Sequence, residues 1–378
     1  MTRSGGRVSM KPAYPDSGYR LNSNSPRSWL AFGLIWLLGV DLRITLLAVP
    51  PVLPLIHRDL ALNEKAVGSL TAMPVLLLGI WAIGGSLLIS RIGARRAVIV
   101  GLIVISVTSA ARGLGPTTAM LFGMTFLMGI GVAVCQPAAP TLIGEWFPRS
   151  IGLATAVYVN GLLVGETLSA AFTIPWALPV AGGSWERTFV FWAVPVAATA
   201  VLLVALTREN RPARAERAQW WPDWKAWRTW QIGLLLGGIS VSYFGANAFM
   251  PDYLHATGRP QLIGIGLAAL NAGQLPGSFL TLFIAQRIAG RKDLFIAIGI
   301  VVLAALAAML SPFAWLFIGG SAFLGCAAAL SLTMVVALPA MLTRQDDVAR
   351  LSAGMFTTGY TVRFSGRSWA ERLGMRRT

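Results

Sequence analysis

Charged side chains are scarce in this sequence. Of its 378 residues, only 12% are Asp, Glu, Lys or Arg, whereas 55% are hydrophobic. A soluble protein carries about 25% charged residues, so the composition excludes an ordinary soluble globular protein. The apolar residues come in runs of about 20, the length that a helix needs to cross a bilayer. The alternating pattern of a membrane β-barrel is absent. The sequence therefore predicts an all-α, polytopic membrane protein.

Cysteine and histidine are also rare, which limits metal, redox and acid–base chemistry. Cys135 and Cys326 lie in separate apolar runs, without metal-ligand spacing and without an obvious disulfide role. His57 and His255 stand singly at the ends of predicted helices. We recognise no nucleophile–base set and no metal cluster, so we expect neither an enzyme nor a cofactor.

Acidic residues are outnumbered, and the net charge is +16. The positions of the basic residues argue against a nucleic-acid partner, because Lys and Arg cluster in alternate loops. With the N-terminus in the cytoplasm, 20 of them fall on the inside and 5 on the outside, as the positive-inside rule requires. We expect a multi-pass monomer of the bacterial inner membrane, whose partners are the lipid bilayer and a small-molecule substrate.

Ten apolar runs are long enough to be spans. They cover residues 30–56, 67–90, 97–114, 119–143, 151–178, 188–206, 230–250, 262–288, 294–310 and 313–342. The predicted domains are a disordered cytosolic arm at 1–28, an N-terminal six-helix half at 29–206, a cytosolic central loop at 207–229, an incomplete C-terminal half at 230–362 and an aberrant basic tail at 363–378.

The two halves resemble each other weakly. Pro54 corresponds to Pro251, the Arg91-Ile92 pair to Arg287-Ile288, and Gly129 to Gly325, at offsets of 197, 196 and 196. A parallel repeat of six-span halves, joined by a basic loop, is the plan of the major facilitator fold.

The same offset indicates that the second half is shorter than the first at its C-terminal end. The sixth span ends near Leu206, so its counterpart would end near residue 402, beyond the end of the chain. The apolar stretch 351–362 is too short to cross a bilayer, and arginines follow it. We interpret this as truncation or a change of reading frame, with the last one or two helices missing or aberrant. An interfacial amphipathic end is the alternative.

Ionisable residues inside predicted spans are candidates for function, because a charge in the bilayer core is costly. Arg43 suits an anion, since a guanidinium offers five donors and stays charged. Asp41 is two positions away and does not share its helix face. Glu166 lies deep in the fifth span. Asp41 and Glu166 are the candidates for proton coupling; a purely structural ion pair or a hydrogen-bonded acid is the alternative.

Uncharged polar residues complete the candidate site. Asn247 and Asn271 lie near mid-depth of the seventh and eighth spans, and Gln136 and Tyr158 lie in the fourth and fifth. Most such residues in membrane proteins only hydrogen-bond between helices. We predict that these four line the substrate path, without a catalytic or metal-binding role.

Several short motifs resemble those of known transporters. The turn at residues 86–96 resembles the loop signature of the major facilitators, with Ser90 in place of its aspartate. In the first span, Asp41-Leu42-Arg43-Ile44-Thr45 and the Pro51–Ile56 end resemble the branch of cyanate and nitroimidazole transporters. Segments 147–158 and 351–360 resemble the same branch.

The resemblance implies a secondary active transporter that works by alternating access. Its cargo would be a small anion or a small polar or nitrogenous compound, such as cyanate. Proton coupling is a hypothesis that rests on Asp41 and Glu166. The alternatives are a drug or metabolite efflux pump and a non-transporting or defective membrane protein.

Overall fold

A computed structural model describes residues 26–115, 117–207, 219–288 and 291–372. The described chain is helical and contains no strand. Within the described residues, eight helices are long and apolar enough to cross a membrane. A ninth span arises if the pair of helices on either side of Trp81, bent by 50°, counts as one. The shorter apolar helix Asp293–Met309 matches the predicted ninth span. The prediction of an all-α membrane protein is confirmed.

The first half of the chain builds the predicted spans one to six. Its elements are α1 (Pro26–Ile44), α2 (Val49–Leu60), α3 (Glu64–Ile80), α4 (Ala82–Ile92), α5 (Ala94–Ala111), α6 (Thr118–Trp146), α7 (Ile151–Phe172), the π-helical η1 (Thr173–Ala177), α8 (Leu178–Val180) and α9 (Trp185–Leu206).

The second half builds the remaining spans. Its elements are α10 (Trp227–Ala256), the 3₁₀ turn η2 (Pro260–Leu262), α11 (Ile263–Ala272), α12 (Gln274–Ile288), α13 (Lys292–Met309), α14 (Ala314–Leu342) and α15 (Gln345–Arg372). The predicted arm at 1–28 lies almost wholly outside the described residues. Helix α15 continues past residue 362, where the predicted apolar run ends, so the first part of the predicted tail is helical.

The first span is broken between α1 and α2. Pro50 and Pro51 have no N–H for the carbonyls one turn earlier, which disfavours a continuous helix. Side chains from neighbouring helices bind the carbonyls at the break: Ser169 Oγ donates to Ile44 O at 3.1 Å, and Arg112 Nη2 donates to Thr45 O at 3.1 Å. Such partners are what irregular backbone requires at membrane depth.

Glycines bring α1 against α7. A Cβ added to Gly39 would lie 2.3 Å from Tyr158 O, and one added to Gly161 would lie 2.3 Å from Trp36 O. At Gly165 the corresponding distance, to Val40 O, is also 2.3 Å. The two helices therefore touch backbone to backbone, the close approach that small residues permit in membrane bundles.

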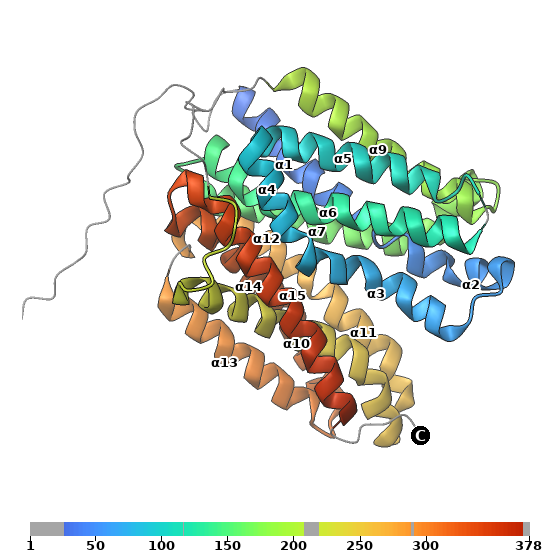
Figure 1. Cartoon of the computed structure of the whole chain (residues 1–378). Helices are drawn as coiled ribbons and strands as arrows, with labels where there is room; N and C mark the ends of the chain where they lie inside the picture. Colours follow the sequence, from blue (N-terminus) through green and yellow to red (C-terminus); the bar gives the residue numbers. More distant parts are fainter. Residues whose placement is uncertain (1–25, 116, 208–218, 289–290, 373–378) are drawn as a thin grey trace, which may run out of the picture.

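The bundle has two ends, which we name from the chain. The linker end carries the residues around the segment that joins α9 to α10, and the far end carries the α2–α3 and α10–α11 connections (Figure 1). The extensive contacts between the halves involve α15 with α3, α4 and α6, and α7 with α12 and α14. At the far end, α2 packs on α3, α9 and η1 of its own half.

Helix α15 belongs to the second half in sequence but packs on both halves. It lies along α10 and crosses α4 and α6 (Figure 1). Its buried residues Leu351, Met355 and Phe356 join the large hydrophobic cluster of the first half. Thr357 Oγ1 donates to Gly79 O on α3 at 2.7 Å. Helix α15 thus links the two halves.

Gly161→Ala tests the glycine contact. The added Cβ would meet the Trp36 carbonyl, so the helices must separate; we expect a clear drop in the Tm of the purified protein. Gly33→Ala is the matched control, because a Cβ there has nothing within 4 Å and alanine favours the helix. Equal Tm values for the two variants would contradict the packing described.

Candidate functional site

Arg43 lies where helices of both halves meet. It lies in the last turn of α1, and its side chain is half-buried. Its guanidinium interacts electrostatically with Tyr158 and Glu166 of α7, Tyr243 of α10 and Tyr360 of α15. Three tyrosines and one carboxyl from three other helices thus lie within electrostatic range of a single permanent cation, and we call these five side chains the central cluster.

Tyr158 has an unused hydroxyl in this cluster. The side chain is 1% exposed, and its Oη has no hydrogen-bond partner among the described residues. A buried polar group without a partner costs roughly 1–3 kcal/mol. This hydroxyl is therefore available as a hydrogen-bond donor within electrostatic range of Arg43.

Asp41 is separate from the central cluster. Its side chain is fully buried inside the first half, near Thr199 of α9 and Cys135 of α6. Neither carboxyl oxygen has a hydrogen-bond partner within the described residues. Asp41 and Arg43 therefore point to different surroundings, as their spacing predicted, whereas Glu166 lies near Arg43.

The second half contributes a hydrogen-bonded polar network. Tyr243 Oη donates to Asn271 Oδ1 at 2.6 Å and accepts from Gln274 Nε2 at 2.5 Å. Asn271 Nδ2 donates to Asn247 Oδ1 at 3.0 Å, and Asn247 Nδ2 donates to Tyr243 O at 3.1 Å. The predicted residues Asn247 and Asn271 thus connect to the central cluster through Tyr243, which interacts with Arg43 and Glu166.

A break in the eighth span positions this network. Helices α11 and α12 meet at Gly273, where a Cβ would lie 2.3 Å from Ala322 O. Pro276 lacks the N–H that would continue the helix. The break lies between Asn271 and Gln274, and both side chains reach the Tyr243 hydroxyl.

Gln136, which was predicted to line the path, and Asn160, which was not, have different surroundings. Gln136 is 3% exposed on α6 and takes no part in the hydrogen bonds above. Asn160 Nδ2 donates to Ser278 Oγ on α12 at 3.0 Å, and Asn160 Oδ1 accepts from Trp36 Nε1 at 2.9 Å. Asn160 therefore joins the halves directly, next to the central cluster in α7.

Sequence reasoning missed Arg112. It lies near the end of the predicted third span at 97–114, and its side chain is fully buried. It donates to Thr45 O and to Ser109 Oγ, and its guanidinium lies 4.2 Å from the Phe189 ring centroid. An arginine at the end of an apolar run resembles an ordinary loop charge, so no sequence signal marked it.

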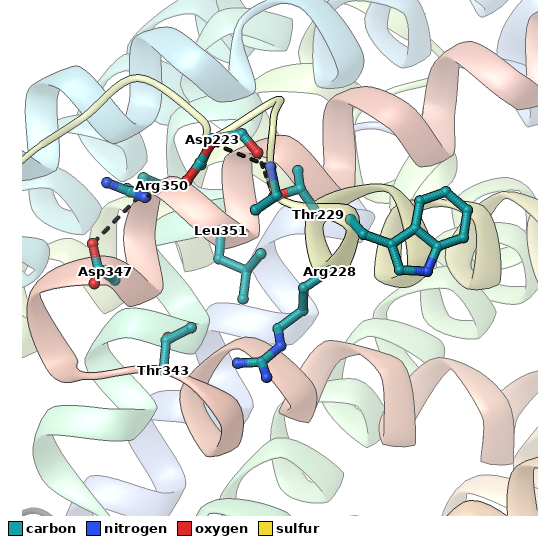
Figure 2. Close-up of a pocket in the computed structure, with 9 residues that line it drawn as sticks. Asp223, Arg228, Thr229, Thr343, Asp347, Arg350 and Leu351 are labelled. Carbon is teal, nitrogen blue, oxygen red and sulfur yellow. Dashed lines mark hydrogen bonds and ion pairs between the residues drawn. The ribbon is translucent and has the colours of Figure 1, made fainter.

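Two surface pockets of the described chain are lined by residues outside the central cluster. One, of about 280 Å³, is at the linker end and is lined by Asp223, Arg228, Thr343, Asp347 and Arg350 among others (Figure 2). Another, of about 440 Å³, is at the far end and is lined by Pro50, Leu53, Pro54, His57 and Val67. Neither combines a cation with the buried tyrosines.

The structure has a broken first span, two helical halves and a polar cluster between the halves. This arrangement is typical of a membrane transporter. The family model described as Major Facilitator Superfamily matches residues 32–366. The chain belongs to the Major Facilitator Superfamily. This membership confirms a transporter rather than an enzyme, and it confirms the fold expected from the internal repeat.

The relatives of this transporter include the branch that its motifs resemble. It is 28% identical over 264 residues to the cyanate transport protein CynX of Escherichia coli K12, which covers 69% of this chain and 68% of CynX. It is 29% identical over 152 residues to the 2-nitroimidazole transporter of the same strain, or 40% and 38% of the two chains. A probable nitrate transporter, NarT of Staphylococcus aureus MRSA252, is 26% identical over 157 residues, or 41% and 39%.

Solved structures share the fold of this transporter. The proton:xylose symporter XylE, bound to 6-bromo-6-deoxy-D-glucose, aligns with a TM-score of 0.69 at 12% identity over 92% of this chain and 88% of XylE. At this identity the likeness shows the fold alone.

Tyr243→Phe tests the network of the second half. Removing the hydroxyl leaves buried Gln274 Nε2 without its acceptor, so we expect a loss of about 1–3 kcal/mol in stability, measured as a lower Tm. Adding Gln274→Leu removes the stranded amide and should recover part of the loss. Tyr253→Phe is the matched control, because that hydroxyl bonds Leu310 O at an exposed position. A loss equal to the control's would contradict the network.

Proposed function

We propose that this transporter carries a small anion, of the size of cyanate or nitrate, across the bacterial inner membrane by alternating access. The single observation behind the proposal is the position of Arg43. It meets tyrosines from both halves of the protein, so a ligand on its guanidinium would touch both halves at once. Rocking of one half against the other would then move the ligand between the two sides of the membrane.

The chemistry of the central cluster favours an anion. A guanidinium in a low-dielectric site forms strong, charge-assisted hydrogen bonds with oxygen or nitrogen anions. Tyr158 Oη, buried and without a partner among the described atoms, would donate a further bond. A neutral sugar would instead need many donors and acceptors of both kinds.

The names of the relatives support the same class of cargo. One is a cyanate transporter, one a 2-nitroimidazole transporter and one a probable nitrate transporter. Cyanate and nitrate are small anions with delocalised charge, and a nitro group carries partial negative charge on two oxygens. An arginine with neighbouring hydroxyls suits all three.

The direction of access is part of the proposal. The extensive contacts between halves involve α15 with α4 and α6, and α7 with α12, which meet from mid-depth to the linker end. We therefore propose that the central cluster is reached from the far end in this conformation. We propose that the linker side faces the cytoplasm, and the excess of Lys and Arg on that side supports this orientation.

Proton coupling is proposed for Glu166. Its carboxyl interacts with Arg43 and Tyr243. An anion that binds Arg43 would bring a second negative charge beside this carboxyl, and two like charges in one low-dielectric site oppose each other. Protonation of Glu166 would relieve the repulsion, so a proton would travel with the anion. Asp41, buried in the first half, remains a second candidate.

Arg43→Ala should abolish anion recognition. Hydrogen bonds to charged groups contribute roughly 1.5–3 kcal/mol, so the Kd for cyanate should rise at least about tenfold. The measurement is the shift in Tm of the purified protein with increasing cyanate, with nitrate as a second ligand. Arg43→Lys keeps the charge and should lose only part of the affinity.

Arg187→Ala is the control for this experiment, because Arg187 is exposed at the far end. It removes the same charge and should keep the wild-type shift. An unchanged shift in Arg43→Ala would refute the assigned role.

Glu166→Gln should uncouple transport from the proton gradient. In proteoliposomes, wild-type uptake of cyanate should rise several-fold when the side of entry is made acidic, because protonation of Glu166 favours anion binding. The variant carries a permanently neutral side chain, so its uptake should ignore the gradient. Asp41→Asn, tested in parallel, separates the two candidate acids. If wild-type uptake is the same after an uncoupler collapses the gradient, the coupling proposal fails.

A further inference from the structure

In its described part, the linker between α9 and α10 is hydrogen-bonded to a buried side chain of α4. Ser86 on α4 is fully buried, and its Oγ donates to Trp220 O in the linker at 2.8 Å. The acceptor is a backbone carbonyl, so this bond depends on the path of the linker and not on a particular side chain. The linker is therefore held against α4.

The same short segment contacts α15 of the second half. Arg350 donates from Nη1 to Gln219 Oε1 and from Nη2 to Asp223 Oδ2, the latter at 3.3 Å. Arg350 also pairs with Asp347 of its own helix at 3.4 Å. Figure 2 shows Arg350 between the two carboxylates. One turn further along α15, Gly354 lies against Pro222 of the linker, where a Cβ added to the glycine would be 3.2 Å from the proline ring.

Asp223 is held in place by its own backbone contacts. Its Oδ1 accepts from the N–H groups of Lys225 at 3.1 Å and Ala226 at 3.3 Å. Its carbonyl accepts from Thr229 Oγ1 at 2.9 Å. One carboxylate oxygen thus shapes the turn that enters α10, and the other faces Arg350.

We propose that linker residues 219–223, with Ser86 and Arg350, form a clasp that holds the linker end closed and opens once in each transport cycle. This inference rests on the proposed alternating access. A rocking motion that opens the linker end must separate α4 from α15, and the described part of the linker is bonded to both. The clasp biases the transporter toward the conformation with the linker end closed.

The strength of the clasp suits a contact that must open repeatedly. The Arg350 and Asp223 side chains are 18% and 44% exposed, so water and salt screen their attraction. Exposed ion pairs are weak, and losing this one should change the ratio of open to closed linker ends by about two- to fivefold.

Distances between spin labels across the linker end test the clasp. Spin labels at Arg149→Cys and Arg344→Cys, both exposed positions, report the distance between the two halves in the full chain. Cys326 is replaced by alanine so that it takes no label, and Cys135 is kept because it is fully buried. Asp223→Asn keeps the backbone turn and removes the charge. We expect Asp223→Asn and Arg350→Gln each to increase the share of long distances by about two- to fivefold, and the double variant to add nothing further.

Asp346→Asn is the matched control. Asp346 is exposed in the first turn of α15, so the variant makes the same change of charge next to the clasp and should leave the distances unchanged. Unaltered distances in both clasp variants, or an equal shift in Asp346→Asn, would overturn the proposal.

The cyanate-induced shift in Tm separates this test from that of the anion site. If the clasp variants keep the shift but show longer distances, both proposals stand. If no protein responds to cyanate while the distances still change, only the anion proposal fails.

Discussion

The direct backbone contact between α1 and α7 is the constraint on which the central cluster depends. Gly39, Gly161 and Gly165 let the two helices touch without intervening side chains. Arg43 follows this contact on α1, and Tyr158 and Glu166 flank it on α7. A larger residue at any of the three glycines would move the cation away from its hydroxyl and carboxyl neighbours. Packing and chemistry thus share one interface.

In the low dielectric of the bilayer core, each polar group of this interface that lacks a hydrogen-bond partner costs free energy. Water does not solvate charge in the bilayer core, so broken helices require side-chain partners. Ser169 and Arg112 supply them at the break after α1, and Tyr243 gathers Gln274 and Asn271 at the break between α11 and α12. Both breaks lie beside the central cluster. The irregular backbone that sets up these contacts is therefore part of the proposed site.

In the proposed transport cycle, the linker clasp and the central cluster have separate roles. The cluster would discriminate between ligands, because it offers the Arg43 cation and the Tyr158 hydroxyl, which is unpaired within the described residues. The clasp acts at one end of the bundle through exposed groups that salt can screen. The turn that resembles the family's loop signature has Ser90 where an aspartate is usual, and Ser90 Oγ bonds to Leu87 O of its own helix. An acidic residue of the linker, Asp223, makes the ion pair with α15.

Composition, span length and charge position were sufficient to establish an all-helical membrane protein, the ten apolar runs and the resemblance to major facilitators, because these properties depend on the hydrophobic thickness of the bilayer and on short motifs. Helical spacing also separated Asp41 from Arg43. The tertiary structure alone decided which polar residues meet. Gln136 and Asn271 look alike in sequence, yet only Asn271 joins the Tyr243 network; Arg112 looks like a loop charge, yet it is buried; and α15 packs on the half to which it does not belong. Such contacts depend on which face each helix turns toward residues that are distant in the sequence. The local sequence of a membrane helix does not specify that face, because the helix is apolar on nearly every side.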